Sequence, residues 1–235
     1  MKAYNILKLT ILLGIIAPLS GCELYYMPPH NQTPTHFEKG DIAFTLQGFY
    51  TGSASASYAI TDHAFLGASV MGYSNSNNDT INNDLFRTVT LEGGYYNWVP
   101  STNLHMEIMG GVGSGRSEDP VNSFGVDFNR FYIQPSFGFI SKHRNFQNHL
   151  TFRVSHVAYE DQINGPSAFG VNFFEPSYSF RAGSPYVKFH MQLGLSLAMG
   201  SIESRPNDYA HDPFIFGFGV NANLNVFGKS RRPAN

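Results

Sequence analysis

The fold is decided by Val187 to Met199, VKFHMQLGLSLAM, in which apolar residues alternate with polar or small ones. Valine, phenylalanine, methionine and leucine occupy the odd-numbered positions, whereas Lys188, His190 and Gln192 occupy even-numbered ones. A period of two residues is the pattern of a β-strand whose two faces lie in different surroundings. Residues 214–226 repeat it, with phenylalanine, valine and leucine on one face and glycine and asparagine on the other.

The same period recurs along the chain from Asp41 onward. It predicts ten strands, at 41–50, 53–60, 64–73, 85–98, 104–116, 128–141, 149–159, 170–181, 186–200 and 213–227. Most of them reach or exceed the roughly 9–11 residues with which a tilted strand crosses a bilayer. An even number of antiparallel strands can close without leaving an edge. We therefore expect an all-β fold, a closed antiparallel up-and-down transmembrane β-barrel of ten strands over residues 40–228. Eight strands are the alternative, because strand boundaries read from a sequence are loose.

The connections between these strands alternate in length. Those at 61–63, 100–103, 143–148 and 182–185 are short, whereas those at 74–84, 117–127, 160–169 and 201–212 are longer and polar. The tight link at 51–52 is the exception. Outer-membrane barrels have short periplasmic turns and long outer loops. With an even number of strands, the pattern predicts that both chain ends emerge on the periplasmic side, where a lipidated Cys22 would lie.

Alternation alone does not separate a membrane barrel from a soluble barrel that carries an apolar ligand. Charged residues make up only 14% of the chain, compared with about 25% in typical soluble domains. The less apolar face of the strands consists mainly of small residues, which suit a crowded interior better than a water-facing surface. We expect the strand charges to project inward as a polar network, because lone buried charges are costly. This network comprises Arg87, Glu92, Glu107, Arg130, Arg153, Glu175, Arg181 and Lys188.

The first 21 residues have the three parts of a bacterial signal peptide. Lys2 and Lys8 give a basic start, and residues 9–19 are apolar but too short to span a bilayer. The run Leu19-Ser20-Gly21-Cys22 resembles the lipobox of bacterial lipoproteins, which implies cleavage before Cys22 and acyl chains, such as palmitate, on that cysteine. We expect a signal peptide at 1–21, a lipidated N-terminus and flexible Pro-rich tether at 22–39, and a basic tail at 229–235.

Aromatic residues lie near the predicted strand ends. Either they form the girdles of a membrane barrel or they reflect the preference of aromatic residues for strands. The set is Tyr95, Tyr96 and Trp98 at the periplasmic end and Tyr50, Tyr73, Tyr132 and Phe173 at the outer end.

No motif points to catalysis or to a cofactor. The histidines do not form a zinc-protease motif, although His105, Glu107 and His190 share one predicted face, where they could bind a cation. His211-Asp212 lies in a predicted outer loop without a second acidic pair. A net charge of −2 argues against nucleic-acid binding. We expect no catalytic, cofactor-binding or metal residues.

Three further stretches resemble the uncharacterised lipoprotein β-barrels of Bacteroidota-type Gram-negative bacteria. They are Glu38 to Asp41, Ser57 to His63 and Phe131 to Pro135, and the resemblance covers nearly the whole mature chain. It implies an outer-membrane barrel inserted by the barrel-assembly machinery, with outer-membrane lipids and the acyl chains on Cys22 as partners. The machinery reads a terminal aromatic residue, whereas here Phe227 is followed by Gly228 and the basic tail.

The sequence therefore predicts a lipid-anchored outer-membrane barrel with a structural or surface-interaction role. The alternatives are a small pore or ligand conduit, a lipid-anchored soluble barrel carrying an apolar ligand, and a membrane enzyme acting at the outer rim.

Overall fold

The computed structural model describes residues 24–31, 36–49, 51–74, 85–99, 101–119, 124–161, 167–199, 210–211 and 213–225. The expected signal peptide, Cys22 and the basic tail lie outside these residues. Within the described ranges, no helix has the length and apolar character needed to cross a membrane.

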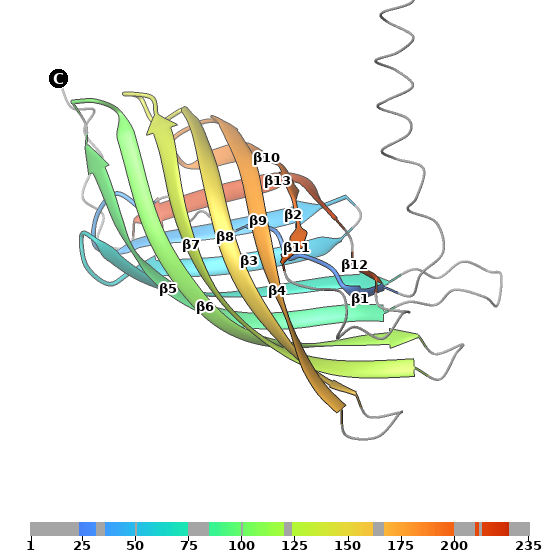
Figure 1. The fold of residues 1–235 in the computed structure, drawn as a ribbon. Helices are drawn as coiled ribbons and strands as arrows, with labels where there is room; N and C mark the ends of the chain where they lie inside the picture. The colour runs from blue at the N-terminus through green and yellow to red at the C-terminus, as the bar shows by residue number, and fades with distance from the viewer. Residues whose placement is uncertain are drawn as a thin grey trace, which may run out of the picture.

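The chain folds as a closed antiparallel barrel (Figure 1). Each strand pairs with the next, and the ring closes where β13 pairs with both β2 and β10. The wall consists of β2 (Asp41–Gly48), β3 (Gly52–Ala59), β4 (Ala64–Ser74), β5 (Leu85–Val99), β6 (Leu104–Asp119), β7 (Phe124–Ile140), β8 (Phe146–Asp161), β9 (Ser167–Gly183), β10 (Val187–Leu195), β11 (Leu197–Met199) and β13 (Phe214–Asn225). Since β10 and β11 are two parts of one strand interrupted at Ser196, the barrel has ten strands.

The two ends of the barrel differ. We call the end with connections 60–63, 100–103, 141–145 and 184–186 the turn end; β2 begins there and β13 finishes there. The other end, with connections 49–51, 75–84, 120–123, 162–166 and 200–213, is the loop end. Two connections predicted to be long are short, because β6 to β9 extend into them. The additional residues of β6 and β7 remain paired with each other. Among them, Arg116 lies opposite Asp127 and forms an ion pair with it at 3.1 Å.

The two faces of the wall have opposite character, as the period of two predicts. The outer face exposes large apolar side chains from all parts of the ring, including Leu46, Leu66, Leu91, Val112, Ile133, Val154, Phe189 and Val220. The inner face buries polar side chains, including Gln47, Thr88, Gln134, His149, Gln192 and Asn221. This arrangement is that of an outer-membrane-type barrel, with an apolar band outside and a polar lumen inside.

Of the two explanations for the aromatic residues near strand ends, an interfacial girdle does not apply to four of the seven. Tyr73, Tyr96, Tyr132 and Phe173 are buried and face the lumen, whereas Tyr95 is exposed on the outer face. Tyr50 lies outside the described residues. Because side chains alternate along a strand, proximity to its end does not decide which face an aromatic residue occupies.

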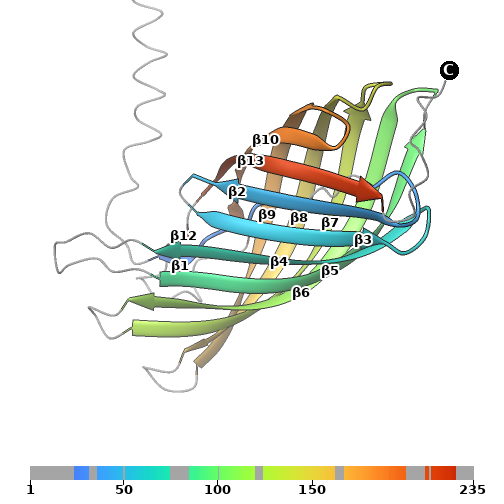
Figure 2. The ribbon, with the colours of Figure 1, turned by 180° about the vertical axis from the view of Figure 1, so that it is seen from behind.

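Two short strands were not predicted. β1 (Leu24–Tyr26) pairs in parallel with β12 (Ala210–His211). Both lie at the loop end, away from the arrowhead of β13 that marks the turn end (Figures 1 and 2). The N-terminal segment therefore starts at the end opposite to the one at which β2 enters the wall.

Candidate functional site: a polar lumen occupied by the N-terminal segment

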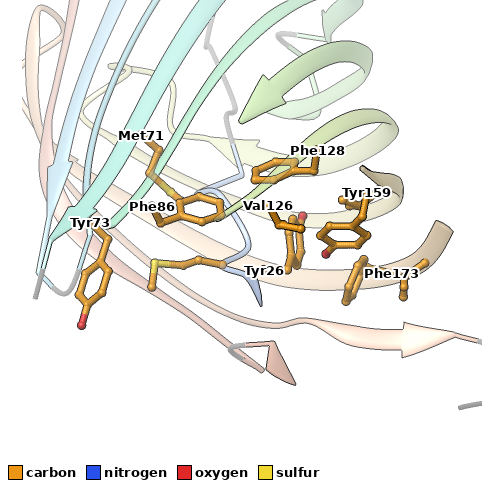
Figure 3. Packing of buried hydrophobic residues seen from close by; sticks show 11 residues of the cluster. Tyr26, Met71, Tyr73, Phe86, Val126, Phe128, Tyr159 and Phe173 are labelled. Atoms are coloured by element: carbon orange, nitrogen blue, oxygen red, sulfur yellow. The ribbon is translucent and has the colours of Figure 1, made fainter. Parts of the chain in front are cut away.

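Residues 24–31, which we call the plug, occupy the lumen. Tyr26 and Met27 are buried in an apolar cluster at the loop end that includes Phe86, Phe128 and Phe173 (Figure 3). The Tyr26 ring stacks on Phe173, with centroids 4.4 Å apart, and meets Phe128 edge-on at 6.4 Å. An aromatic contact of this kind adds about 0.5–1.5 kcal/mol to the burial of the ring. The apolar cluster thus fixes the plug at the loop end.

The second half of the plug forms hydrogen bonds with the wall. His30 Nε2 lies 3.1 Å from the Phe216 carbonyl oxygen, and His30 Nδ1 lies 2.7 Å from Ser53 Oγ. Because a carbonyl can only accept, Nε2 carries the proton and Nδ1 accepts from the Ser53 hydroxyl. Asn31 Nδ2 donates to Ser177 Oγ at 2.7 Å. Gly217 makes room for the imidazole, because a Cβ there would lie 2.6 Å from His30 Nε2.

The segment then reaches the turn end. His36 is buried, with Nε2 3.0 Å from Ser57 Oγ and its ring 5.6 Å from that of Tyr96. The Asp41 carboxylate accepts hydrogen bonds from the backbone N–H groups of residues 37 and 38, where the chain turns into β2. The expectation of a flexible tether at 22–39 therefore does not hold at residues 26–31 and 36. Their apolar and hydrogen-bonding side chains match the lumen that surrounds them.

An ion pair lies beside the plug. Arg153 Nε donates to Glu175 Oε2 at 2.6 Å, and both side chains are almost fully buried, at 2% and 0% exposure. Adjacent strands hold the two residues in register. Further hydrogen bonds surround the pair: Ser155 and Tyr26 donate to the Glu175 carboxylate, and Arg153 donates to the Pro29 carbonyl oxygen at 2.7 Å. The pair thus joins the plug to the wall.

Two further predicted residues lie in the same layer. The Tyr132 hydroxyl donates to Glu92 Oε2 at 2.9 Å, and Arg130 donates to Thr90 Oγ1 at 3.2 Å. The guanidinium carbons of Arg130 and Arg153 lie 5.0 and 5.5 Å from the centre of the Tyr132 ring. This layer therefore brings four of the predicted charges together, Glu92, Arg130, Arg153 and Glu175.

The turn-end half of the lumen holds the other buried charges. Glu107, Arg181 and Lys188 are buried there, beside His105, His149 and His190. The rings of His105 and His149 lie edge to face, 5.2 Å apart. Within the described part of the chain, neither ring nitrogen of His105 or His149 and neither carboxylate oxygen of Glu107 has a hydrogen-bond partner. Buried polar groups without protein partners are normally bound by ordered water.

Arg87 does not belong to the lumen. Its side chain is 64% exposed on the outer face near the loop end, 3.8 Å from Glu118. Arg116 pairs with the same glutamate and with Asp127, so these four residues form a charged group at the rim. Arg87 shares its face with apolar residues such as Val89. A charge is tolerated on this face because the rim lies beyond the apolar band.

The structure assembles no metal site among the residues it describes: no three of their His, Cys, Asp and Glu side chains are placed to hold an ion. His105, Glu107 and His190 do face the same lumen, although His190 Nδ1 contacts Gln47 Nε2 at 2.5 Å. The side chain of His211 and residue Asp212 lie outside the described part.

Burial shifts the pKa of two plug residues. Burial lowers the pKa of His30, and the positive charge of Arg153 lowers it further. The hydrogen bond to the Phe216 carbonyl oxygen acts in the opposite direction and is outweighed. Burial, followed by the charge of Glu175, raises the pKa of Tyr26 to about 12. Burial therefore favours the neutral form of both side chains.

Sequence reasoning missed the plug residues Tyr26, His30 and Asn31. One signal was present, because Tyr25, Tyr26 and Met27 form an apolar run that a solvated tether does not need.

A pocket lies beside the plug. It is lined by Met27, Pro28, His30, Phe49, Thr51 and Phe216, among others.

No protein-family model and no curated protein matches the chain. Among solved structures, the barrel is similar to the N-terminal β-barrel domain of Pseudomonas aeruginosa OprF, with 10% sequence identity and a TM-score of 0.32. The match covers 79% of this chain and 98% of that domain structure.

Proposed function

We propose that this protein is a lipid-anchored β-barrel of the outer membrane of a Gram-negative bacterium, without catalytic activity. Its role is structural or is to present a surface to partners. Outer-membrane lipids surround the barrel, acyl chains on Cys22 anchor it, and the barrel-assembly machinery inserts it. The observation that carries the proposal is the division of the wall into an apolar outer face and a polar lumen.

The occupied lumen supports a role that does not depend on transport. Ten strands enclose little more space than their own inward side chains fill. Here the plug adds Tyr26, Met27, His30 and Asn31 to that filling. The loop end then offers a surface to partners, as the outer loops of such barrels do.

Cell fractionation of the Cys22→Ser variant tests the proposal. A spanning barrel stays in the outer-membrane fraction after washing with urea or at high pH, because strands rather than acyl chains hold it. Radiolabelled palmitate should enter the parent chain and not the variant. Recovery of the variant as a soluble periplasmic protein would overturn the spanning barrel and favour the lipid-anchored carrier of an apolar ligand. The polar lumen weighs against that carrier.

A small conduit is the second candidate. It is favoured by buried polar atoms of His105, Glu107 and His149 that have no hydrogen-bond partner among the described residues, a setting in which ordered water is usual. Conduction would require the plug to leave the other half. Planar-bilayer recordings distinguish the two candidates: the proposed function predicts no steady conductance from the full chain, whereas a conduit conducts.

A further inference from the structure

We propose that the mature N-terminus leaves the barrel at the loop end, so that acyl chains on Cys22 enter the leaflet that the loops face. The sequence alone favoured the opposite end, where β2 begins. The inference rests on the lipid anchor and membrane orientation of the proposed function, and adds the direction in which the N-terminal segment runs.

The described contacts fix that direction. Asp41 begins β2 at the turn end, where the ring of buried His36 lies against Phe65 and Tyr96. Asn31 contacts Ser177, further along the lumen, and Tyr26 packs among aromatic residues at the loop end. The segment therefore lies in the lumen with its earlier residues toward the loop end, where Tyr26 packs against Phe128 and Phe173 (Figure 3).

Strand pairing places the start of the plug independently. Leu24 lies opposite Ala210 in the parallel pair of β1 and β12. β12 comes immediately before β13, whose first residue, Phe214, is at the loop end. Leu24 is therefore at that end as well.

Chain length excludes a return of Cys22 to the turn end. Cys22 lies two positions before Leu24 in the sequence, a span of at most about 7 Å. β5 runs between the two ends over 15 residues, and at about 3.3 Å per residue it is roughly 50 Å long. Even with a strand tilt of about 40°, the barrel is several times longer than the available chain.

The resulting arrangement brings the lipid and the loops to one face of the membrane. Because the segment lies inside a closed ring, the wall must close around it or the segment must enter before insertion is complete. The lipid would then hold the loop end against its leaflet, and the plug would connect that leaflet with the turn end.

Epitope accessibility tests the inference in the full chain. A short epitope is inserted after Cys22, within residues 75–84, or after Asn235, and each protein is expressed in a Gram-negative host. Antibody should label the first two on intact cells and the third only after permeabilisation. If the N-terminal epitope, like the C-terminal one, is labelled only after permeabilisation, the inference is wrong, although the spanning barrel is not contradicted. If the loop epitope and the C-terminal epitope are labelled under the same condition, they lie on one side of the membrane. That result would contradict both the spanning barrel and the inference.

A crosslink tests the position of the plug without an inserted epitope. In the Cys22→Ser background, Asn31→Cys and Ser177→Cys should be joined by a short thiol-reactive crosslinker, because the native side chains are 2.7 Å apart. The matched control pairs Asn31→Cys with Tyr178→Cys, whose side chain is exposed on the outer face. A folded barrel that crosslinks at Tyr178, or at neither position, would contradict a plug inside the lumen.

Discussion

The Tyr26 hydroxyl donates to Glu175 Oε1 at 3.2 Å, across 149 positions of the sequence. The same carboxylate is paired with Arg153, whose guanidinium also binds the Pro29 carbonyl oxygen. One buried ion pair therefore holds two wall strands and two plug residues. Its loss should affect both the stability of the barrel and the retention of the plug.

Glu175→Gln should destabilise the barrel strongly. The substitution leaves the Arg153 charge buried without its counter-ion, which typically costs about 3–5 kcal/mol. Urea unfolding in lipid vesicles, followed by tryptophan fluorescence, measures the loss.

Two controls accompany this variant. Arg87→Gln, at the exposed rim, should change the free energy of unfolding by no more than about 0.5 kcal/mol. The double variant Arg153→Met, Glu175→Leu should recover much of the loss, because it removes both charges. Equal effects of Glu175→Gln and Arg87→Gln would refute the buried ion pair.

Gly217→Ala should displace the plug while the wall remains intact. Its new Cβ would lie 2.6 Å from His30 Nε2, so the imidazole must move away from Ser53 and Phe216. We expect faster reaction of a water-soluble maleimide with Asn31→Cys, measured in the Cys22→Ser background. Gly48→Ala is the matched control, because a Cβ there meets nothing within 4 Å. Identical labelling rates in the two variants would mean that His30 does not dock as described.

Docking of the plug should weaken in acid. Burial lowers the pKa of docked His30, whereas the released residue has an ordinary pKa of about 6.5. The released state therefore binds the proton more readily. Above about pH 6.5 the equilibrium constant for docking of the plug does not change with pH. Below it, the constant falls by up to about tenfold per pH unit, until the pH reaches the pKa of docked His30.

The labelling rate of Asn31→Cys at pH 8, 6 and 5, corrected for the thiol's own reactivity with a model peptide, measures this release. His30→Gln keeps hydrogen-bonding groups but cannot take up a proton, so it should remove the pH dependence. A pH dependence that persists in His30→Gln would assign the effect to another group.

A charge on the apolar band should be costly. Leu91 is 62% exposed on the outer face of β5, so Leu91→Arg would place a guanidinium in lipid. Near the bilayer midplane such a change costs about 2–4 kcal/mol. Tyr186→Arg, at a residue that is 54% exposed but lies in a turn, should cost about 0–1 kcal/mol. Unfolding in vesicles compares the two, and equal losses would argue against a membrane around the band.

The wall could be predicted from the sequence because each strand carries its own period of two. Val187 to Met199 shows both faces without reference to any other strand, and only its interruption at Ser196 was not visible. The face of Arg87 was misassigned because the outer surface changes from apolar to polar at the rim. A charge there no longer indicates the lumen.

The plug could not be predicted in the same way. β1 has only three residues, and its partners lie far away in the sequence, in β12 and across the lumen. Tyr26 and His30 acquire their environment only after the ring has closed. Local periodicity carries no information about such contacts, and only the apolar character of residues 25–27 distinguished this segment from a solvated tether.

The central claim is that this chain is a membrane-spanning barrel, and the most direct measurement is folding of the Cys22→Ser protein with and without detergent. We predict a folded monomer only in detergent or lipid, with faster gel migration before boiling than after it. A folded, detergent-free monomer in plain buffer would contradict the claim, because the apolar outer face would then be exposed to water.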